Sequence, residues 1–456
     1  MGFQEKLAYA WKQHQAGQVQ QAEQSYRQVL DVDPNHADAW VYLGIALFDQ
    51  RQFSESAAAY REALNRGEQN PIAWNNLGNS LRMLGQIEEA DQCFENALAQ
   101  KPDYLSALKN RGTLWIWSGE IDRGLSWYQR GLEVAPNHVE LHRNLGVIYL
   151  LQQDYKRGWP EYRWRWHMPD MSRPRLPAPV WRGESLQGKT ILLYPEQGLG
   201  DAIHFVRMAS VLQSQGARVL FRCAPRLLSL FTSVPGIDQL VLEQAMIPRV
   251  DYHASLVDVV DVLWSKTGQM EWGAGAFSGK DHYLTVSREL IAYWEHWMLQ
   301  ELPKPVRRIG INWQGNREHH ADVYRSVPLE VLRPLAEING IQLVCLQFGD
   351  GAEQLNACDW SDRVVRLPEH VDSEGAFTDT TAIIQHLDAV VTTDTSLAHL
   401  AGAAGVPAHV ILGRVPDWRW GMNEQTTNWY PSVRLHRQAT LGDWTGVINT
   451  VADALQ

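Results

Sequence analysis

The sequence predicts an α + α/β protein, in which an all-helical repeat array precedes an α/β region built from two similar halves. Three observations support this fold class. Glycines recur every 34 residues through the first third of the chain. A proline-rich stretch, 168–189, then interrupts the pattern. Beyond it, short apolar runs alternate with helical patterns, and the alternation starts again near residue 306.

The bulk composition limits the class of protein. A chain of 456 residues should hold two or three domains, and 45% hydrophobic with 20% charged residues is typical of a globular protein. The net charge of −11 argues against binding to nucleic acid or to anionic membranes. No apolar run approaches the length of a membrane helix, and no signal peptide is visible. We therefore expect a cytoplasmic protein whose scattered cysteines are reduced and mostly buried.

Two kinds of residue carry the repeat. Its glycines are Gly44, Gly78, Gly112 and Gly146, and its aromatic residues are Tyr26, Tyr60, Phe94, Tyr128 and Tyr162. Glycine permits two helices to approach closely, and the aromatic ring fills the gap between neighbouring hairpins. The pattern resembles the tetratricopeptide signature and predicts about five helical hairpins over residues 1–167. Such solenoids commonly bind a protein or peptide along their concave face, and a spacer or a dimer interface is the alternative.

Residues 190–305 and 306–456 are predicted to form two Rossmann-like halves with parallel sheets and a cleft between them. The last core strand is expected at 408–412, followed by a long loop that contains 417–420 and 428–431. Tryptophan and tyrosine rings in these two segments suit stacking on a sugar or a base. They could equally lock the C-terminal segment in place.

The segment 183–190 matches the Walker A pattern residue for residue. A phosphate-binding loop of that kind needs a strand before it and a helix after it. Here a proline-rich connector precedes the segment and a predicted strand follows. The sequence therefore predicts a turn leading into a strand, and no nucleotide site at this place.

The most informative segment is the end of the predicted buried strand 388–392. Asp394, Thr395 and Ser396 stand where the next helix begins, and the unpaired N–H groups of a helix N-terminus attract anions. His399 follows one helical turn after Thr395, so it can face the same ligand. This layout predicts a phosphate or pyrophosphate site at the carboxyl edge of a sheet. Because the whole chain is acidic, the site itself should be locally positive, through the helix end, histidine or arginine.

A glycine-bearing turn follows the first strand of the first half. Gly198 and Gly200 allow a close backbone approach to a ligand, and Asp201 opens the next helix. Asp201 is either a helix N-cap or a general base that deprotonates an acceptor hydroxyl. Glu196 is the rival for the role of base.

A comparable turn opens the second half. Gln314 and Asn316 supply amide side chains there, and Arg325 with Ser326 could bind phosphate charge, unless they form an ordinary surface loop. His319 and His320 are adjacent, with no further ligand at metal spacing, so we expect no metal site.

These motifs resemble one enzyme superfamily. Gly200-Asp201 after the first strand, together with Asp394-Thr395 and His399 near the end, is similar to the lipopolysaccharide heptosyltransferase family of GT-B glycosyltransferases over about 190–440. The whole chain resembles bacterial tetratricopeptide proteins with a heptosyltransferase-like domain. Its layout is also similar to that of O-linked N-acetylglucosamine transferases. Lipopolysaccharide heptosyltransferases carry no such repeats, and the loop motifs here differ from those of the N-acetylglucosamine enzymes, so protein and glycan acceptors both stay open.

The resemblance implies a metal-independent glycosyltransferase without a cofactor, which takes a nucleotide-sugar donor in the second half and an acceptor in the first. It makes Asp201 the catalytic base. The expected donor-binding residues are Gly200, Gln314, Asn316, Arg325, Ser326, Gln347, Asp394, Thr395, Ser396 and His399. A protein acceptor presented by the repeats is expected. The alternative is a non-catalytic scaffold whose GT-B domain is inactive or only binds nucleotide.

Overall fold

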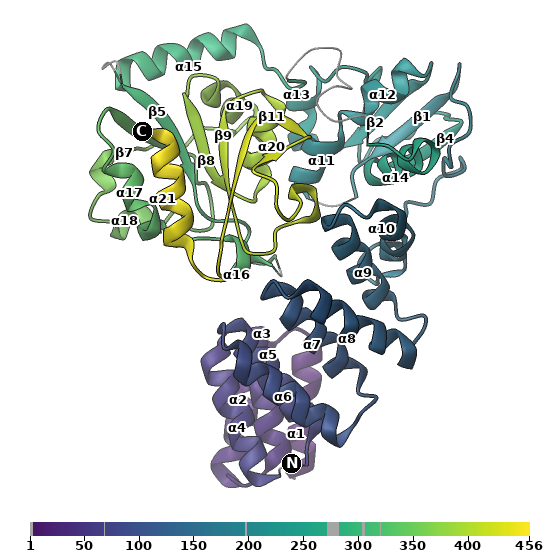
Figure 1. Ribbon diagram of the computed structural model, residues 1–456, viewed down its shortest axis with the longest axis vertical. Coiled ribbons are helices and arrows are strands. Elements are labelled where there is room, and N and C mark those ends of the chain that lie inside the picture. The colour runs from purple at the N-terminus through teal and green to yellow at the C-terminus, as the bar shows by residue number, and fades with distance from the viewer. Residues whose placement is uncertain (1–2, 68, 197, 271–281, 303–305, 320) are drawn as a thin grey trace. The chain divides into compact units, whose positions relative to one another are not determined.

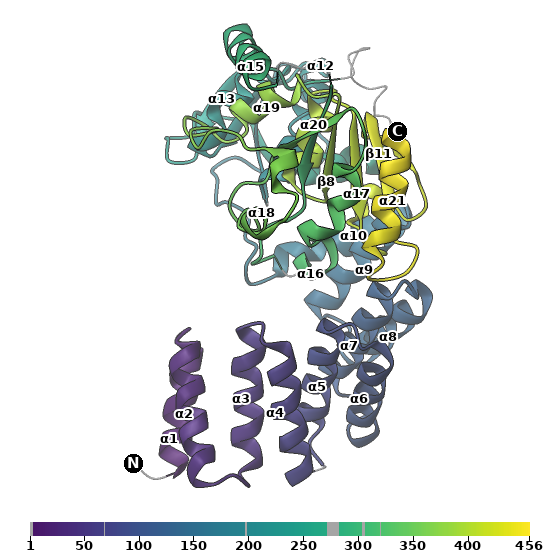
Figure 2. The same ribbon diagram turned by 90° about the vertical axis from the view of Figure 1, so that its left-hand side faces the viewer.

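The computed structural model describes residues 3–456 except 68, 197, 271–281, 303–305 and 320 (Figures 1 and 2). The chain forms two compact units. The first contains Met1–Ile148 with Glu161–Arg165, and the second contains Tyr149–Pro160 with Trp166–Gln456.

The first unit consists of antiparallel helix pairs, which stand side by side in Figure 2. The helices are α1 (Phe3–Gln15), α2 (Val19–Val32), α3 (Ala37–Asp49), α4 (Phe53–Arg66), α5 (Pro71–Met83), α6 (Ile87–Gln100), α7 (Leu105–Trp117), α8 (Ile121–Val134), α9 (Val139–Leu151) and α10 (Tyr155–Tyr162). The end of α9 and most of α10 belong to the second unit. The predicted helical repeat is confirmed.

Packing of an aromatic ring on a glycine sets the distance between paired helices. A Cβ atom on Gly44 would lie 2.6 Å from the ring of Tyr60, and one on Gly78 would lie 2.7 Å from the ring of Phe94. Tyr60 and Phe94 are buried, and both belong to one apolar cluster that contains residues of several helix pairs. Each ring thus fills a space that only glycine leaves open, which explains the period seen in the sequence.

The second unit contains two sheets. The first has the strand order β3-β2-β1-β4 with every pair parallel, as predicted. Its strands are β1 (Thr190–Tyr194), β2 (Arg218–Cys223), β3 (Gln239–Leu242) and β4 (Tyr252–Ser255), and its helices are α11 (Leu199–Phe205), α12 (Met208–Ser214), α13 (Leu228–Phe231) and α14 (Leu256–Thr267). Because β1 directly follows 183–189, this segment leads into a strand, and the rejection of a Walker A loop is confirmed.

The second sheet has the order β10-β11-β9-β8-β5-β6-β7, and only β10 is antiparallel to its neighbour. The strands are β5 (Arg307–Asn312), β6 (Ile341–Cys345), β7 (Val364–Val365), β8 (Ala389–Thr393), β9 (Ala408–Leu412), β10 (Thr426–Thr427) and β11 (Tyr430–Arg437). The helices are α15 (Arg288–Glu301), α16 (Asp322–Arg325), α17 (Arg333–Ala336), α18 (Gln354–Ala357), α19 (Thr378–Ile384), α20 (Ser396–Ala403) and α21 (Trp444–Leu455). Helix α21 packs on the apolar core beside β5, β6, β8 and β9.

The expectation of a long loop after β9 is wrong. Strand β11 pairs in parallel with β9 and buries Tyr430, Val433 and Leu435, while the residues between them are more exposed. Pro431 and the charged residues of this strand hide its alternating pattern, because proline is depleted in strands. Helix α14 was also not anticipated.

The cysteines are free thiols, and Cys93, Cys223 and Cys345 are buried, as expected. Burial raises the pKa of the Cys223 thiol to about 11. In the described part of the chain, no helix combines the length and the apolar character that a membrane span requires.

Gly78→Ala tests the packing of rings on glycines. We expect it to lower the free energy of unfolding of the chain by about 1–3 kcal/mol, because the new methyl group displaces the buried Phe94 ring. Urea denaturation followed by circular dichroism measures this loss.

Gly67→Ala is the matched control. Its Cβ atom would meet only the Ala37 methyl group, 4.0 Å away, so a change within about 0.5 kcal/mol is expected. Equal stability of the two variants would contradict the account of the repeat.

Candidate functional site

Asp201 lies on α11, directly after the glycine turn that follows β1. Gly198, and not Asp201, occupies the N-cap position, and Asp201 is the third residue of the helix. The capping alternative for Asp201 is therefore wrong. Its carboxylate Oδ1 instead accepts a hydrogen bond of 2.7 Å from Nη2 of Arg419, which lies on the second half of the α/β region.

The Asp394 turn lies against the same helix. Strand β8 ends at Thr393, Thr395 is the N-cap of α20, and Ser396 is its first residue. Figure 1 shows α11 beside α20. A Cβ atom on Gly200 would lie 3.1 Å from the His399 ring and 3.3 Å from Ser396 Oγ. The two motifs that the sequence singled out thus meet at the carboxyl ends of two parallel sheets.

Arg419 holds this junction together. It lies in the 3-10 turn η6 (Trp418–Trp420), it is 8% exposed, and its Nη1 donates to Asp417 Oδ1 over 2.6 Å. One guanidinium is therefore shared by carboxylates of both halves, since its Nη2 donates to Asp201. The guanidinium also lies over the rings of Phe205, at 5.0 Å, and Trp418, at 4.9 Å.

Trp420 from the same turn positions Asp394. Its indole Nε1 donates to Asp394 Oδ1 over 2.8 Å, and its ring stacks on His399 with centroids 5.0 Å apart. The segment 417–420 had two open interpretations, ring stacking on a ligand or locking of the C-terminal segment. Trp420 is 1% exposed, so it locks the site from within.

The carboxylates have shifted acidities. Burial raises the pKa of Asp201 to about 6, against the opposing charge of Arg419. Burial likewise raises the pKa of Asp394 to about 6, assisted by the charge of Asp417 and opposed by the hydrogen bond from Trp420. Burial acts on Asp417 in the same direction, but the charge and hydrogen bonds of Arg419 outweigh it and lower the pKa. Raised carboxyl pKa values in a junction of this kind are typical of functional sites.

Of the three sources of positive charge that the sequence offered, the helix end, histidine and arginine, His399 contributes none. Burial and the charge of Arg419 lower its pKa to about 3, so the ring is neutral. Its Nδ1 and the hydroxyl of Tyr430 form a hydrogen bond of 3.1 Å. The positive charge comes instead from Arg419 and Arg325.

Arg325 and Ser326 lie beside the Asp394 turn. Arg325 Nη1 donates to the Asp394 carbonyl oxygen over 3.1 Å, and its guanidinium packs on Gly315, where a Cβ atom would be 2.8 Å from Nη2. Ser326 Oγ accepts from the Gly315 N–H at 2.9 Å and donates to Asp322 Oδ1 at 2.5 Å. The glycine of this turn thus lets the guanidinium approach the helix end.

The amide side chains of the second half form hydrogen bonds to loops and to neighbouring side chains of the same half. Gln347 is buried, its Oε1 accepts from the backbone N–H groups of Trp313 and Gln314, and its Nε2 donates to the Gln314 carbonyl oxygen. Its amide therefore joins two loops. Gln314 Nε2 donates to Asp322, and exposed Asn316 accepts from the backbone of Glu318.

Thr395 is turned toward the sheet, where its hydroxyl donates to Asn312 Oδ1 over 3.2 Å. Of the paired histidines, His319 accepts from the Ala321 N–H, and His320 lies outside the described residues.

A buried seam that the sequence analysis missed joins the two halves. His204 Nδ1 and the Tyr430 hydroxyl form a hydrogen bond of 2.6 Å. Arg207, 1% exposed, donates to the Trp429 carbonyl oxygen at 2.7 Å and to the Tyr283 hydroxyl at 2.9 Å. A sequence signal was present, since 428–431 is rich in aromatic residues, but nothing in the pattern named its partners.

Known proteins match the N-terminal region most clearly. The tetratricopeptide repeat family matches residues 13–71 and 71–104. The N-terminal region therefore contains tetratricopeptide repeats, and a region of parallel sheets and helices follows it. The repeats imply protein–protein interaction.

Among individual proteins, the chain is similar to "Protein FlbA" of Caulobacter vibrioides, with 26% identity over 314 residues. The match covers 66% of this chain and 52% of the relative, so the chain spans about half the length of this curated relative. Similar solved structures include MamA (18% identity, TM-score 0.31, 35% of this chain and 92% of that one). YrrB, titled a TPR protein with an unusual peptide-binding site, has 20% identity and a TM-score of 0.30, covering 36% of this chain and 84% of that one. A thermophilic TPR protein of Thermus thermophilus has 16% identity and a TM-score of 0.34, covering 37% of this chain and 92% of that one.

Arg419→Met tests the shared guanidinium. We expect the free energy of unfolding to fall by about 3 kcal/mol near pH 8, because two largely buried carboxylates lose their counter-charge. Without Arg419 the pKa of Asp201 rises further above its unfolded value, and such a group loses stability as pH increases. The deficit should therefore shrink as the pH is lowered toward about 5. Urea denaturation at both pH values measures it.

Arg434→Met provides the control for charge removal. Arg434 is exposed on β11, so little change is expected at either pH. A deficit in Arg419→Met that is independent of pH would contradict the electrostatic account.

Proposed function

We propose that the second unit is a glycosyltransferase, which moves a sugar from a nucleotide-sugar donor to an acceptor hydroxyl. One observation carries the proposal. A carboxylate with a raised pKa, Asp201, lies at the carboxyl end of one parallel sheet, and the N-terminus of α20 lies beside it at the carboxyl end of the other. A base facing an anion site is the arrangement that this transfer needs.

The chemistry of the acceptor side rests on Asp201. In the proposed step its carboxylate takes the proton of the acceptor hydroxyl, whose oxygen forms a bond to the anomeric carbon while the nucleoside diphosphate leaves. A base is most effective when its pKa is close to the working pH, and Asp201, at about 6, meets this condition. Arg419 orients the carboxylate through the hydrogen bond to Oδ1.

The donor side rests on positive charge around the start of α20. The helix begins two residues after Asp394, and the Arg325 guanidinium donates to the Asp394 carbonyl oxygen. Together they suit the oxygens of a leaving diphosphate, since stabilising charge on the departing group lowers the barrier. Because protein groups supply this charge, the proposal requires no metal ion. In the proposal, the repeats present a protein acceptor to the second unit.

A second candidate is a non-catalytic scaffold. It is favoured by the fact that Asp201 already forms an ion pair with Arg419, and Arg419 is in turn occupied by Asp417. In this alternative the junction only holds the two sheets together, and the repeats carry the function by binding a partner.

Asp201→Asn separates the two candidates. The wild-type chain is incubated with a panel of nucleotide-sugars and candidate acceptor peptides in EDTA, while release of free nucleotide and thermal shift are followed. Under the proposal a donor binds and is turned over, and kcat/KM declines below about pH 6 as Asp201 becomes protonated. Asp201→Asn should keep donor binding and lose turnover by roughly a hundredfold or more.

Asp453→Asn is the control, because Asp453 is an exposed carboxylate on α21. This variant should retain full turnover. Donor binding without turnover by the wild-type chain would favour the scaffold. Full activity of Asp201→Asn would exclude Asp201 as the base.

Arg325→Met tests the donor side. We expect donor affinity to fall by roughly tenfold or more, since a charge-assisted contact to phosphate is lost. Isothermal titration with the donor found above measures the affinity. Arg317→Met is the matched control, because Arg317 is exposed near the Gly315 turn and pairs with Glu353. Equal losses in both variants would show a general charge effect rather than a donor site.

A further inference from the structure

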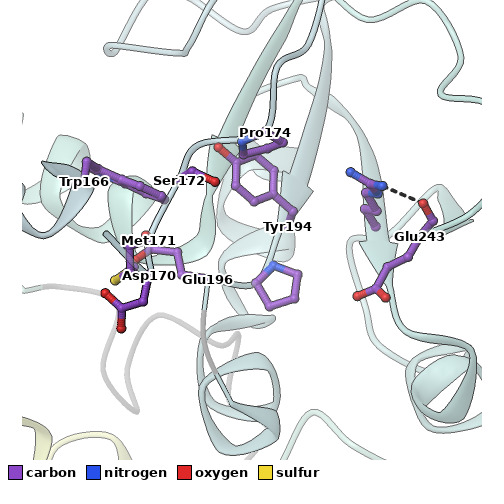
Figure 3. A pocket seen from close by; sticks show the side chains of 10 residues that line it. Trp166, Asp170, Met171, Ser172, Pro174, Tyr194, Glu196 and Glu243 are labelled. Carbon is purple, nitrogen blue, oxygen red and sulfur yellow. Dashed lines mark hydrogen bonds between the residues drawn. The ribbon is translucent and has the colours of Figure 1, made fainter. Parts of the chain in front are cut away.

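The first sheet carries a cavity that the donor and base sites do not use. It has a volume of about 430 Å³ and lies at the carboxyl ends of β1 and β2, next to the proline-rich connector (Figure 3). Its lining residues are Trp166, Asp170, Met171, Ser172, Pro174, Tyr194, Pro195, Glu196, Arg222 and Glu243. In Figure 3, Trp166 and Asp170 lie on one side of Tyr194, and Glu243 lies on the other. A cavity of this size accommodates a side chain with part of its backbone.

The lining has an excess of negative charge. The lining contains three carboxylates, Asp170, Glu196 and Glu243, and one guanidinium, Arg222. Glu196 accepts a hydrogen bond from the Ser255 hydroxyl. Among the residues that the structure describes, the carboxylates of Asp170 and Glu243 form no ion pair. Their charges are therefore available to a cationic guest.

The carboxylates are too far apart to hold one metal ion. In the described part of the chain, the group of three candidate ligand atoms within 4.8 Å of one another is Glu330, Cys358 and Asp359, which is elsewhere. Charge spread around a cavity of this volume suits an extended organic cation.

The aromatic rings that line the cavity also suit a cationic guest. The Arg173 guanidinium already lies 4.6 Å from the centroid of the Trp166 ring, and its Nη2 is 3.0 Å from a carboxylate oxygen of Asp258. The chain thus binds one of its own basic side chains by a ring and a carboxylate at the edge of this cavity. Tyr194 adds a second ring to the lining.

Arg222 requires a hydrogen-bond acceptor from the ligand, not a cation. Its Nη2 donates to the Glu243 carbonyl oxygen over 2.5 Å, and its buried Nε has no hydrogen-bond partner among the described residues. A buried donor of this kind is costly unless it meets an acceptor. A peptide supplies both groups, a cationic side chain for the carboxylates and carbonyl oxygens for Arg222.

We propose that this cavity binds a lysine or arginine side chain of a polypeptide. The identification of this polypeptide as the acceptor rests on the proposed function. Glu196 lines the cavity and lies five positions before Asp201, which is on α11, so a basic residue held here brings neighbouring serine or threonine hydroxyls toward the base. The acceptor would then be recognised by a basic residue close to the modified hydroxyl.

Equilibrium binding tests this site without requiring turnover. The full chain is titrated into the labelled peptide Gly-Ser-Gly-Lys-Gly-Ser-Gly, and into counterparts with norleucine or glutamate in place of lysine, while fluorescence anisotropy is recorded. The lysine peptide should bind at least roughly tenfold more tightly than the norleucine peptide, and the glutamate peptide more weakly still. Glu243→Gln and Asp170→Asn should each weaken binding of the lysine peptide by roughly three- to tenfold, and thermal melts check that both variants are folded.

Glu295→Gln is the matched control, since Glu295 is exposed on α15 and does not line the cavity. It should bind the lysine peptide like the wild-type chain. Absence of binding, equal affinity for the lysine and norleucine peptides, or wild-type affinity in both cavity variants would overturn the proposal. Selective binding without nucleotide release from any donor would retain the cavity site and reject only the transferase.

Discussion

The candidate site depends on one guanidinium. Arg419 donates to Asp201 from the first sheet and to Asp417 from its own turn, and it does so while almost fully buried. A buried charge is tolerated only when it is paired and hydrogen-bonded, so the carboxylates of both halves hold this guanidinium in place. Trp420, its neighbour, then sets the positions of Asp394 and His399.

Burial favours the uncharged form of the carboxyl groups and of the histidine at this junction. Removing water disfavours the ionised form of every group, so the pKa values of Asp201 and Asp394 rise to about 6 while that of His399 falls to about 3. The result is a site with little net charge at mildly acidic pH, and with two arginines as its permanent cations. Under the proposed function, this local balance allows the site to take an anion although the chain as a whole carries a charge of −11.

Sequence patterns predicted the elements that repeat or alternate. The 34-residue spacing of glycines predicted the helix pairs. An aromatic ring packs where the glycine has no side chain, as Phe94 does on Gly78, and this contact fixes the distance between the two helices. Strand ends also indicated the candidate site, because ligands bind at the carboxyl ends of parallel strands. Gly200 follows β1 of one sheet and His399 follows β8 of the other, so their contact depends on how the two sheets pack. Strand β11 was missed, since Pro431 and the charged residues of the strand hide its alternating burial pattern.

The sequence by itself determined the tetratricopeptide repeats, the order of parallel strands and helices, and the residues at the strand ends, because these follow from local periodicity and backbone preference. Only the tertiary structure decided what those residues do. Asp201 is not a cap because Gly198 takes that position, and it pairs instead with Arg419, more than two hundred positions later in the chain. His399 is neutral because burial, assisted by the charge of Arg419, lowers its pKa. Protonation and pairing depend on burial and on neighbours in space, which no local pattern records.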